Sequence, residues 1–345
     1  MYYPKLEEVK KLKGKGTLVP IYREVVADLE TPVSAFLKIN HNGNSFLLES
    51  VEGGQQLARY SFLGTEPYKT ITTSSGDNID PLPLIAEEIK RHKVVPVRGL
   101  PRFCGGAVGY LAYEVATRFE EIPSPDADSL KLPESLFMFV STMLVFDHVT
   151  HRIKVLSHVE LNGEIDSSYA EAVARIEALV DRLKQPLGED HSMKRIKGKS
   201  EITSNMTEEA IEDIVTKAKK YITAGEAIQV VLSQRLSQTV AVEPFDIYRT
   251  LRSINPSPYM FYLDFKDFHI IGASPEILVR VEDGTVMTRP LAGTRPRGKN
   301  PEEDLRLEKE LLSDEKERAD TLSELANDRL DQLNALSEDL EAANE

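Results

Sequence analysis

The stretch IGASPEILVRVEDGTVMTRPLAGTRPRG, residues 271–298, decides the local fold around it. Apolar β-branched residues alternate along 277–281 and return at Val286, which is typical of strands with one covered face. Between them, Asp283-Gly284 is a sequence that favours the tight turn of a hairpin. The stretch therefore predicts two antiparallel strands joined by a short turn.

The loop after this hairpin has the composition of a small-anion site. Gly293 lacks a Cβ and lets a ligand approach the backbone, Thr294 offers a hydroxyl, and Arg295 and Arg297 offer planar guanidinium groups. Glu276 stands at the entrance of the first strand, where a sheltered carboxyl can serve as a proton donor. The same residues also fit an arginine-capped hairpin with no ligand, and the pattern alone leaves both interpretations open.

Composition limits the classes of function. The chain has 345 residues, 41% of them hydrophobic, and a formal net charge of -14, which disfavours a nucleic-acid or anionic-membrane partner. The first residues, MYYPKLEEVKKLKGKG, lack the apolar core of a secretion signal, and no apolar run is long enough to span a bilayer. We therefore expect a globular protein of the cytoplasm.

Strand signals dominate the first part of the chain. Segments 35–39 and 45–50 read as strands around a turn, segments 137–146 and 152–159 read as a second pair, and 167–183 reads as a helix. These signals predict a mixed α+β fold of antiparallel β-sheets flanked by helices.

The second part of the chain follows an exposed, Lys- and Ser-containing connection. We expect a helix capped by Thr207, a strand over 228–236, a hairpin of 260–265 with 268–272, and a helix beginning after Asn300. The last segment has eight acidic residues and one basic residue, with leucines spaced as on one helical face. The predicted division is an N-terminal domain (1–185), a linker (186–205), a partial second domain (206–319) and an acidic amphipathic helical tail (320–345).

Several separated motifs resemble one enzyme family. They are LLES (47–50), RYSFLG (59–64), FCGGAVGYLAYE (103–114), IQVVLSQRL (228–236), NPSPYMFYL (255–263), LAGTRPRG (291–298) and DEKERA (314–319). Together they are similar to the chorismate-utilising enzymes, and specifically to component I of anthranilate synthase, from about Leu18 to Ala319. The resemblance implies a lyase of tryptophan biosynthesis that converts chorismate and ammonia to anthranilate and pyruvate, with ammonia supplied by a glutamine amidotransferase subunit.

The resemblance also assigns roles in the reaction. Glu276 corresponds to the general acid of the family, and Gly293 and Thr294 correspond to its substrate-binding loop. Two positions separate its branches: Gln229 stands where isochorismate and salicylate synthases have a lysine base, and Ala292 stands where aminodeoxychorismate synthases have a lysine nucleophile. Neither residue can supply an amine, which favours direct attack by ammonia and hence anthranilate synthase. Component I of aminodeoxychorismate synthase remains the alternative enzyme.

Feedback inhibition by tryptophan is a further implication of the resemblance. In the family, tryptophan binds between the LLES and NPSPYMF segments, which correspond here to Glu49, Ser50, Pro258, Tyr259 and Met260. Glu49 and Ser50 can bind the amino-acid head group, and Tyr259 and Met260 offer an apolar, polarisable surface to the indole ring.

The chain departs from the family pattern after DEKERA. The family continues with EHLMLVDLARND, whereas this chain continues with DTLSELANDRLD. The Mg²⁺ that the family uses would then depend on Asp320, with Glu317 one helical turn earlier. The second glutamate ligand, the catalytic histidine and the glycine-rich loop of the family have no counterpart here. A catalytically inactive fragment that keeps a tryptophan-binding or partner-binding surface is therefore the alternative from another functional class.

Overall fold

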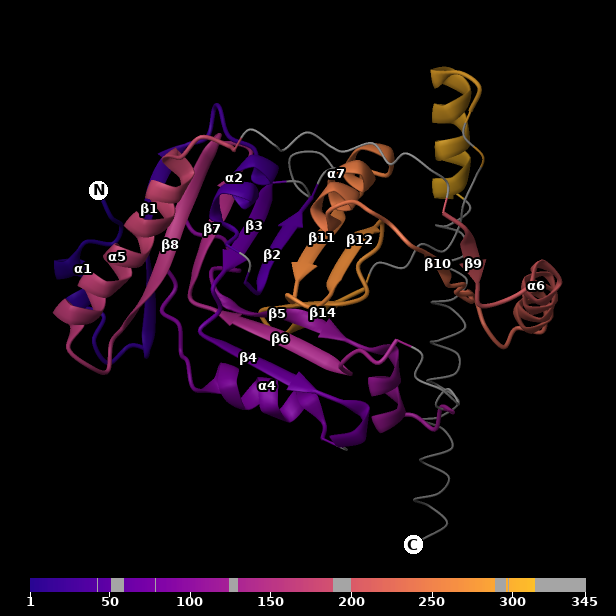
Figure 1. Cartoon of the computed structure of the whole chain (residues 1–345), viewed down its shortest axis with the longest axis horizontal. Coiled ribbons are helices and arrows are strands. Elements are labelled where there is room, and N and C mark those ends of the chain that lie inside the picture. The colour runs from indigo at the N-terminus through magenta and orange to yellow at the C-terminus, as the bar shows by residue number, and fades with distance from the viewer. Residues whose placement is uncertain are drawn as a thin grey trace, which may run out of the picture. The chain divides into compact units, whose positions relative to one another are not determined.

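A computed structural model describes residues 1–41, 43–50, 59–77, 79–123, 130–188, 200–288, 296 and 298–313. Contacts divide the chain into two compact units. The first comprises Met1–Gly198 and Ala241–Pro275, and the second comprises Lys199–Val240 and Glu276–Glu345. Figure 1 shows the chain with most of its helices and strands labelled. Among the described residues, no helix is both long enough and apolar enough to cross a membrane.

An antiparallel sheet of seven strands forms the centre of the first unit, in the order β1-β8-β7-β3-β2-β11-β12. Each neighbouring pair has antiparallel register, so the family-implied α+β class with antiparallel sheets is confirmed. The strands are β1 (Leu18–Val26), β2 (Ser45–Glu49), β3 (Tyr60–Thr65), β7 (Thr142–Asp147), β8 (Arg152–Glu160), β11 (Tyr259–Asp264) and β12 (His269–Ser274).

Helices cover one face of this sheet, and the apolar residues on that face explain why. Leu47, Leu63 and Leu144 occupy neighbouring positions across three strands and are fully buried. The 20-residue helix α5 (Ile165–Lys184) packs on β8 and β1 through one apolar stripe, while α7 (Pro244–Ile254) packs on β11 and β12. The expected helix over 167–183 is thus confirmed. The N-terminal helix α1 (Leu6–Lys10) contacts α5.

The expected strand over 35–39 is wrong, because these residues belong to helix α2 (Pro32–Ile39). The Thr31 side chain accepts a hydrogen bond from the Ser34 backbone N–H at 3.0 Å, and Pro32 occupies the first helical position. Both features start helices, since the first N–H groups of a helix need an external acceptor. The helix buries Phe36 and Ile39 against the sheet, so the apolar residues that suggested a strand form a helical stripe.

A smaller sheet, in the order β4-β6-β5, lies beside the large one in the first unit. Its strands are β4 (Lys69–Thr73), β6 (Ser135–Val140) and β5 (Gly106–Leu111), and α4 (Pro81–Lys90) packs against it. The expected single strand over 137–146 is divided at Ser141: β6 belongs to the small sheet, and β7 pairs with β8 in the large one. Short 3₁₀ turns occupy Ser75–Asp77 and Tyr113–Arg118.

The described residues of the second unit bury little apolar surface. Helix α6 (Glu208–Thr223) begins where predicted, because the Thr207 hydroxyl accepts from the Ala210 N–H at 3.2 Å, yet none of its residues is buried. The expected strand over 228–236 is wrong: only β10 (Leu236–Gln238) pairs, with β9 (Ile202–Ser204), and residues 227–235 form neither helix nor strand. A strand requires a partner, and no other described strand pairs with this segment.

The predicted hairpin of 271–298 is confirmed in its central part. Strands β13 (Arg280–Glu282) and β14 (Thr285–Met287) pair across Asp283 and Gly284. Both turn residues have positive φ, 49° and 77°, as the twist of a two-residue hairpin requires. Residues 301–313 are helical, and the Asn300 side chain accepts from the Glu303 N–H at 2.9 Å, as its predicted capping role requires.

The division into units differs from the predicted boundary at 186–205. Residues Ala241–Pro275, expected in the second domain, belong to the first unit. The reason is strand pairing: β11 adds to β2 over five register pairs, from Met260 with Glu49 to Asp264 with Ser45, and β12 follows it as the edge of the sheet. The acidic tail beginning at residue 320 lies outside the described residues.

Candidate functional site

The end of β2 and the beginning of β11 bring two of the sequence motifs together. Glu49 and Met260 are register partners, Ser50 follows β2, and Pro258 and Tyr259 lead into β11. LLES and NPSPYMF are more than 200 residues apart in the chain and still occupy one end of the sheet. The pairing of two adjacent strands therefore builds this group of residues.

The Glu49 carboxylate is buried and held by α7. The Tyr248 hydroxyl donates to its Oε2 at 2.6 Å, and the Arg252 guanidinium donates through Nε to Oε2 at 3.0 Å and through Nη2 to Oε1 at 3.3 Å. The Glu49 side chain is only 2% exposed, whereas that of Arg252 is 36% exposed. A buried carboxylate with three charge-assisted or hydroxyl hydrogen bonds is an ordered, pre-oriented anion.

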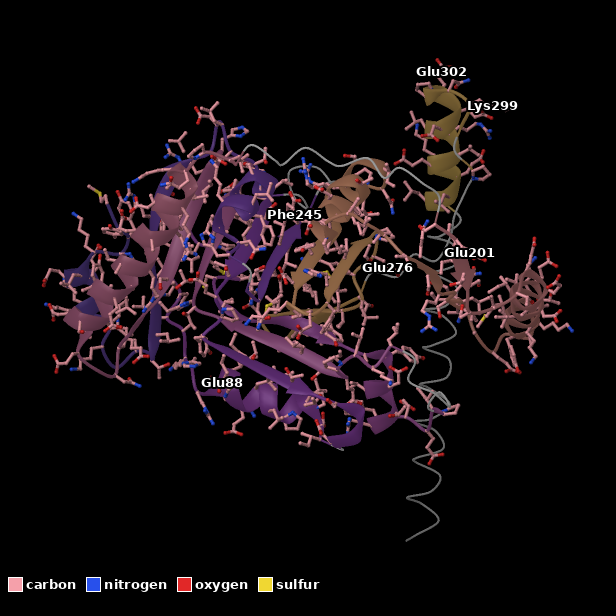
Figure 2. All side chains as sticks on the ribbon, in the orientation of Figure 1. Glu88, Glu201, Phe245, Glu276, Lys299 and Glu302 are labelled. Carbon is pink, nitrogen blue, oxygen red and sulfur yellow. The ribbon has the colours of Figure 1, made fainter. Side chains whose placement is uncertain are left out.

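Aromatic packing positions the donors. Tyr248 is fully buried, and its ring lies 5.6 Å from that of Phe245 and 5.8 Å from that of Tyr262, centroid to centroid. Burial raises the pKa of Tyr248 far above its ordinary value, with the Glu49 charge adding to the effect, so the hydroxyl remains a donor. Figure 2 shows Phe245 on α7, whose first residue is a proline.

Further polar groups lie on the neighbouring strands. The His148 Nε2 and the Ser61 hydroxyl are 2.8 Å apart, and burial lowers the pKa of His148 although the Glu49 charge opposes this. Arg59 donates to both carboxylate oxygens of Asp147, at 3.3 and 3.0 Å. Burial alone would raise the pKa of Asp147, but these bonds from Arg59 lower it. This end of the sheet therefore carries fixed charges of both signs.

The arrangement places a buried carboxylate next to a partly exposed guanidinium. Glu49 supplies the negative charge, and the partly exposed Arg252 supplies a positive one. Met260 differs from its expected role as an apolar contact surface, because its side chain is 1% exposed and packs in the core beneath α7. Tyr259, which points to the opposite face of the strand, is half-buried.

Sequence reasoning missed Tyr248 and Arg252. The available signal was local: Pro244 starts a strongly amphipathic helix, and the two residues are four apart on one of its faces. Nothing in the sequence indicates that this face meets Glu49, since 199 residues separate Glu49 from Tyr248.

The candidate reaction residues belong to the second unit. Glu276 is half-buried and comes directly after the β12 region (Figure 2), and Gln229 is exposed between α6 and β10. Ala292, Gly293 and Thr294 lie outside the described residues, as do Arg295 and Arg297. The structure therefore describes the hairpin leading to the substrate loop and does not describe the loop itself.

The proposed metal ligands Glu317 and Asp320 also lie outside the described residues. Within the part of the chain that is described, no three His, Cys, Asp or Glu side chains are grouped closely enough to hold a metal ion. The Mg²⁺ assignment therefore depends on the chemistry of two carboxylates, the hard-oxygen ligands that Mg²⁺ prefers.

Comparison with known proteins places these features in a family. The family model described as chorismate binding enzyme matches residues 43–332. The anthranilate synthase component 1 of Acetivibrio thermocellus is 44% identical over 338 residues, covering 93% of this chain and 68% of the relative. The probable anthranilate synthase component 1 of Schizosaccharomyces pombe is 41% identical over 324 residues, covering 92% and 66%. This chain thus spans about two thirds of the length of these relatives.

Solved structures of chorismate-utilising enzymes are similar to this chain in fold. Anthranilate synthase component I from Streptococcus pneumoniae TIGR4 matches with a TM-score of 0.61 and 31% identity, covering 86% of this chain and 65% of that one. The menaquinone-specific isochorismate synthase MenF of Escherichia coli matches with a TM-score of 0.53 at 16% identity, covering 91% and 65%, and is similar in fold alone. The chain therefore belongs to the chorismate-binding enzyme family, and its relatives include the anthranilate synthase component 1 proteins that its motifs resemble.

Proposed function

We propose that this chain provides the component I function of anthranilate synthase in the cytoplasm. The observation that carries the proposal is the pair Gln229 and Ala292, at the two positions where the other branches use a lysine. Relatives named anthranilate synthase component 1, at 39–44% identity, support it. The reaction is the conversion of chorismate and ammonia to anthranilate and pyruvate, with the ammonia delivered by a glutamine amidotransferase subunit.

In this reaction Glu276 donates a proton to the departing hydroxyl of the ring. Glu276 belongs to the SPE motif directly after β12, and a carboxyl group can act as a general acid. Gly293 and Thr294 bind the substrate through backbone and hydroxyl groups. Glu317 and Asp320 are the carboxylates that would hold Mg²⁺, which would supply positive charge to offset the negative charge of the substrate.

The test is anthranilate fluorescence after mixing the chain with chorismate, Mg²⁺ and excess ammonium. We expect product formation that chelation by EDTA abolishes and that Glu276→Gln lowers by about 10²- to 10⁴-fold, the usual contribution of a general acid. Glu282→Gln, in the adjoining hairpin, is the matched control and should retain activity. Formation of 4-amino-4-deoxychorismate would identify the alternative, aminodeoxychorismate synthase component I. Absence of turnover, with and without an amidotransferase subunit, would contradict the proposed enzyme activity.

We also propose that the first unit binds tryptophan as an inhibitor, through Glu49, Ser50, Pro258, Tyr259 and Met260. The ordered Glu49 carboxylate beside the partly exposed Arg252 supports binding of an amino-acid head group. The role of Met260 is limited to its backbone and to packing, because its side chain is in the core. This function does not require turnover, so it also fits the alternative of an inactive fragment.

Calorimetric titration with tryptophan tests this second proposal by itself. Saturable binding should weaken about tenfold or more in Ser50→Ala, since one lost hydrogen bond to a charged group is worth that much. Ser253→Ala is the control, because Ser253 is exposed on α7 and bonds only to the helix backbone. Binding that is absent, or unchanged in Ser50→Ala, would refute the assigned site.

A further inference from the structure

A cavity of about 660 Å³ opens in the first unit beside α5. Its walls come from α5, from the ends of β3, β7 and β8, and from β5 and β6 of the small sheet. The volume lies within the range of small-molecule sites, about 300–1,000 Å³. Among the described residues, none of those proposed above for catalysis or tryptophan binding lines the cavity. Thr65, which lines it, ends β3, whereas the Glu49 site lies at the other end of the paired strand β2.

A row of buried polar residues crosses part of the large sheet and reaches the cavity at Thr65. Asp264, Ser45 and Thr65 are successive register partners on three strands. Among the described residues, only four buried side-chain atoms lack a hydrogen-bond partner, and three belong here: Asn40 Oδ1, Ser45 Oγ and Thr65 Oγ1. Asn40 is joined to this row through its Nδ2, which donates to Asp264. Buried polar atoms without partners are costly, so water or a ligand is expected to satisfy them.

Thr65 extends this row to the cavity. Thr65 is 5% exposed and is one of the residues that line the cavity. On the neighbouring strands, the hydroxyls of Thr142 and Ser157 bond to each other at 2.9 Å, so this pair is satisfied without Thr65. The unpartnered hydroxyl therefore belongs to a residue of the cavity wall.

His158 gives the cavity a hydrogen-bond acceptor. This residue is 6% exposed, and its Nδ1 is 2.9 Å from the backbone carbonyl oxygen of Ser141. Because a carbonyl can only accept, Nδ1 carries the proton. Burial lowers the pKa of His158, so the ring is neutral and Nε2 keeps its lone pair. No hydrogen bond within the described part of the chain uses Nε2, and the cavity therefore favours a ligand that donates.

The charges around the cavity favour a cation. Arg182 pairs with Glu66 at 2.7 Å, and Arg175 lies 3.9 Å from Glu171, so each guanidinium already faces a carboxylate. Glu160 and Glu164 also line the cavity, and neither of them has an ion-pair partner among the described residues. The aromatic ring of Tyr68 is also part of the wall, and aromatic faces attract cations.

We propose that this cavity binds a small organic cation that carries N–H donors, a primary amine or a diamine. Its charged end faces Glu160 and Glu164, and its donors bond to His158 Nε2 and to the Thr65 hydroxyl. The site is separate from the proposed enzyme activity, and its binding does not depend on turnover.

The test is a calorimetric titration of the full chain with 1,4-diaminobutane and with 1,4-butanediol, which has the same length without charge or N–H groups. We expect saturable 1:1 binding of the diamine, at least tenfold tighter than binding of the diol and weaker at high salt. The double variant Glu160→Gln/Glu164→Gln should weaken diamine binding about tenfold, because it removes both unpaired carboxylates. Glu120→Gln, an exposed acid outside the cavity, should leave it unchanged.

Thr65→Val provides a second readout that does not rely on charge. The substitution keeps the shape of the side chain and removes the unpartnered hydroxyl, so the free chain should be at least as stable while diamine affinity falls several-fold. Thr73→Val is the matched control: its hydroxyl bonds to Ser135 at 2.8 Å, so stability falls while diamine affinity is unchanged. No saturable diamine binding, equal affinity for the diol, or unchanged affinity in the double variant would overturn the proposal.

Discussion

Removing one hydroxyl, in Tyr248→Phe, should destabilise the first unit by about 2 kcal/mol. The hydroxyl donates at 2.6 Å to Glu49, and both residues are buried, at 0% and 4% exposure. Hydrogen bonds to charged groups contribute about 1.5–3 kcal/mol, and phenylalanine keeps the ring contacts, so no cavity adds to the loss. Glu49 retains its two bonds to Arg252, which keeps the loss near the middle of that range. The equilibrium between folded and unfolded forms should shift about 30-fold.

Urea denaturation followed by tyrosine fluorescence measures this loss, since the chain contains 12 tyrosines and no tryptophan. The midpoint should fall with an unchanged slope, because the surface exposed on unfolding stays the same. Tyr113→Phe, at a side chain that is 77% exposed, is the control and should change stability by less than about 0.5 kcal/mol. In a double-mutant cycle with Glu49→Gln, the two changes should be non-additive. A loss no larger than that of the control would refute the reasoning.

Three further changes test other parts of the fold. The Lys69 side chain donates to Glu88 at 2.6 Å and lowers the pKa of that carboxyl below its usual 4.5. Because Glu88 binds a proton more readily in the unfolded chain, this ion pair stabilises the folded protein above pH 4.5. Lys69→Met should therefore reduce stability above pH 4.5, and the difference should disappear as the pH falls through the pKa of Glu88 in the folded protein. Gly109→Ala should cost about 3 kcal/mol in urea denaturation, because a Cβ there would come within 2.0 Å of the Leu136 carbonyl oxygen in β6. Thr207→Ala should destabilise α6 by about 1 kcal/mol through loss of its N-cap, measured by amide hydrogen exchange.

Each of these changes has a matched control. Lys90→Met removes an exposed lysine of α4 and should leave the pH profile unaltered. Gly163→Ala, where no atom lies within 4 Å of the added carbon, should be nearly neutral. Thr207→Ser should retain the cap. The reasoning fails if Lys69→Met is equally destabilising at all pH values, if the two glycine substitutions cost the same, or if the serine variant exchanges as fast as the alanine variant.

Local sequence signals predicted the elements whose causes are local. Thr207 and Asn300 cap helices because their side chains accept from residues three positions ahead, and Asp283-Gly284 forms a turn because both adopt positive φ. The helix over 35–39 also has a local cause, because Thr31 caps its N-terminus and Pro32 occupies its first position. Element type is therefore readable where the deciding contact lies within a few residues.

The division at Ser141 was not readable in this way. Residues 135–147 form one nearly continuous apolar run, and its two halves enter different sheets. Likewise, the segment 228–236 has strand-like composition, yet only its last residue joins a described strand. Strand formation depends on a partner, and the partner is chosen by the tertiary structure.

The family, the antiparallel α+β class and the identity of the residues proposed for chemistry and effector binding are readable from the amino-acid sequence alone, because motifs and caps are short-range properties of the chain. Only the tertiary structure decided that Ala241–Pro275 completes the first sheet and that Tyr248 and Arg252 hold the Glu49 carboxylate. It also decided that unpartnered polar atoms line up beside a cavity at α5. These features depend on contacts between residues about 200 positions apart or between separate strands, and burial, which sets their energies, exists only once those strands have paired.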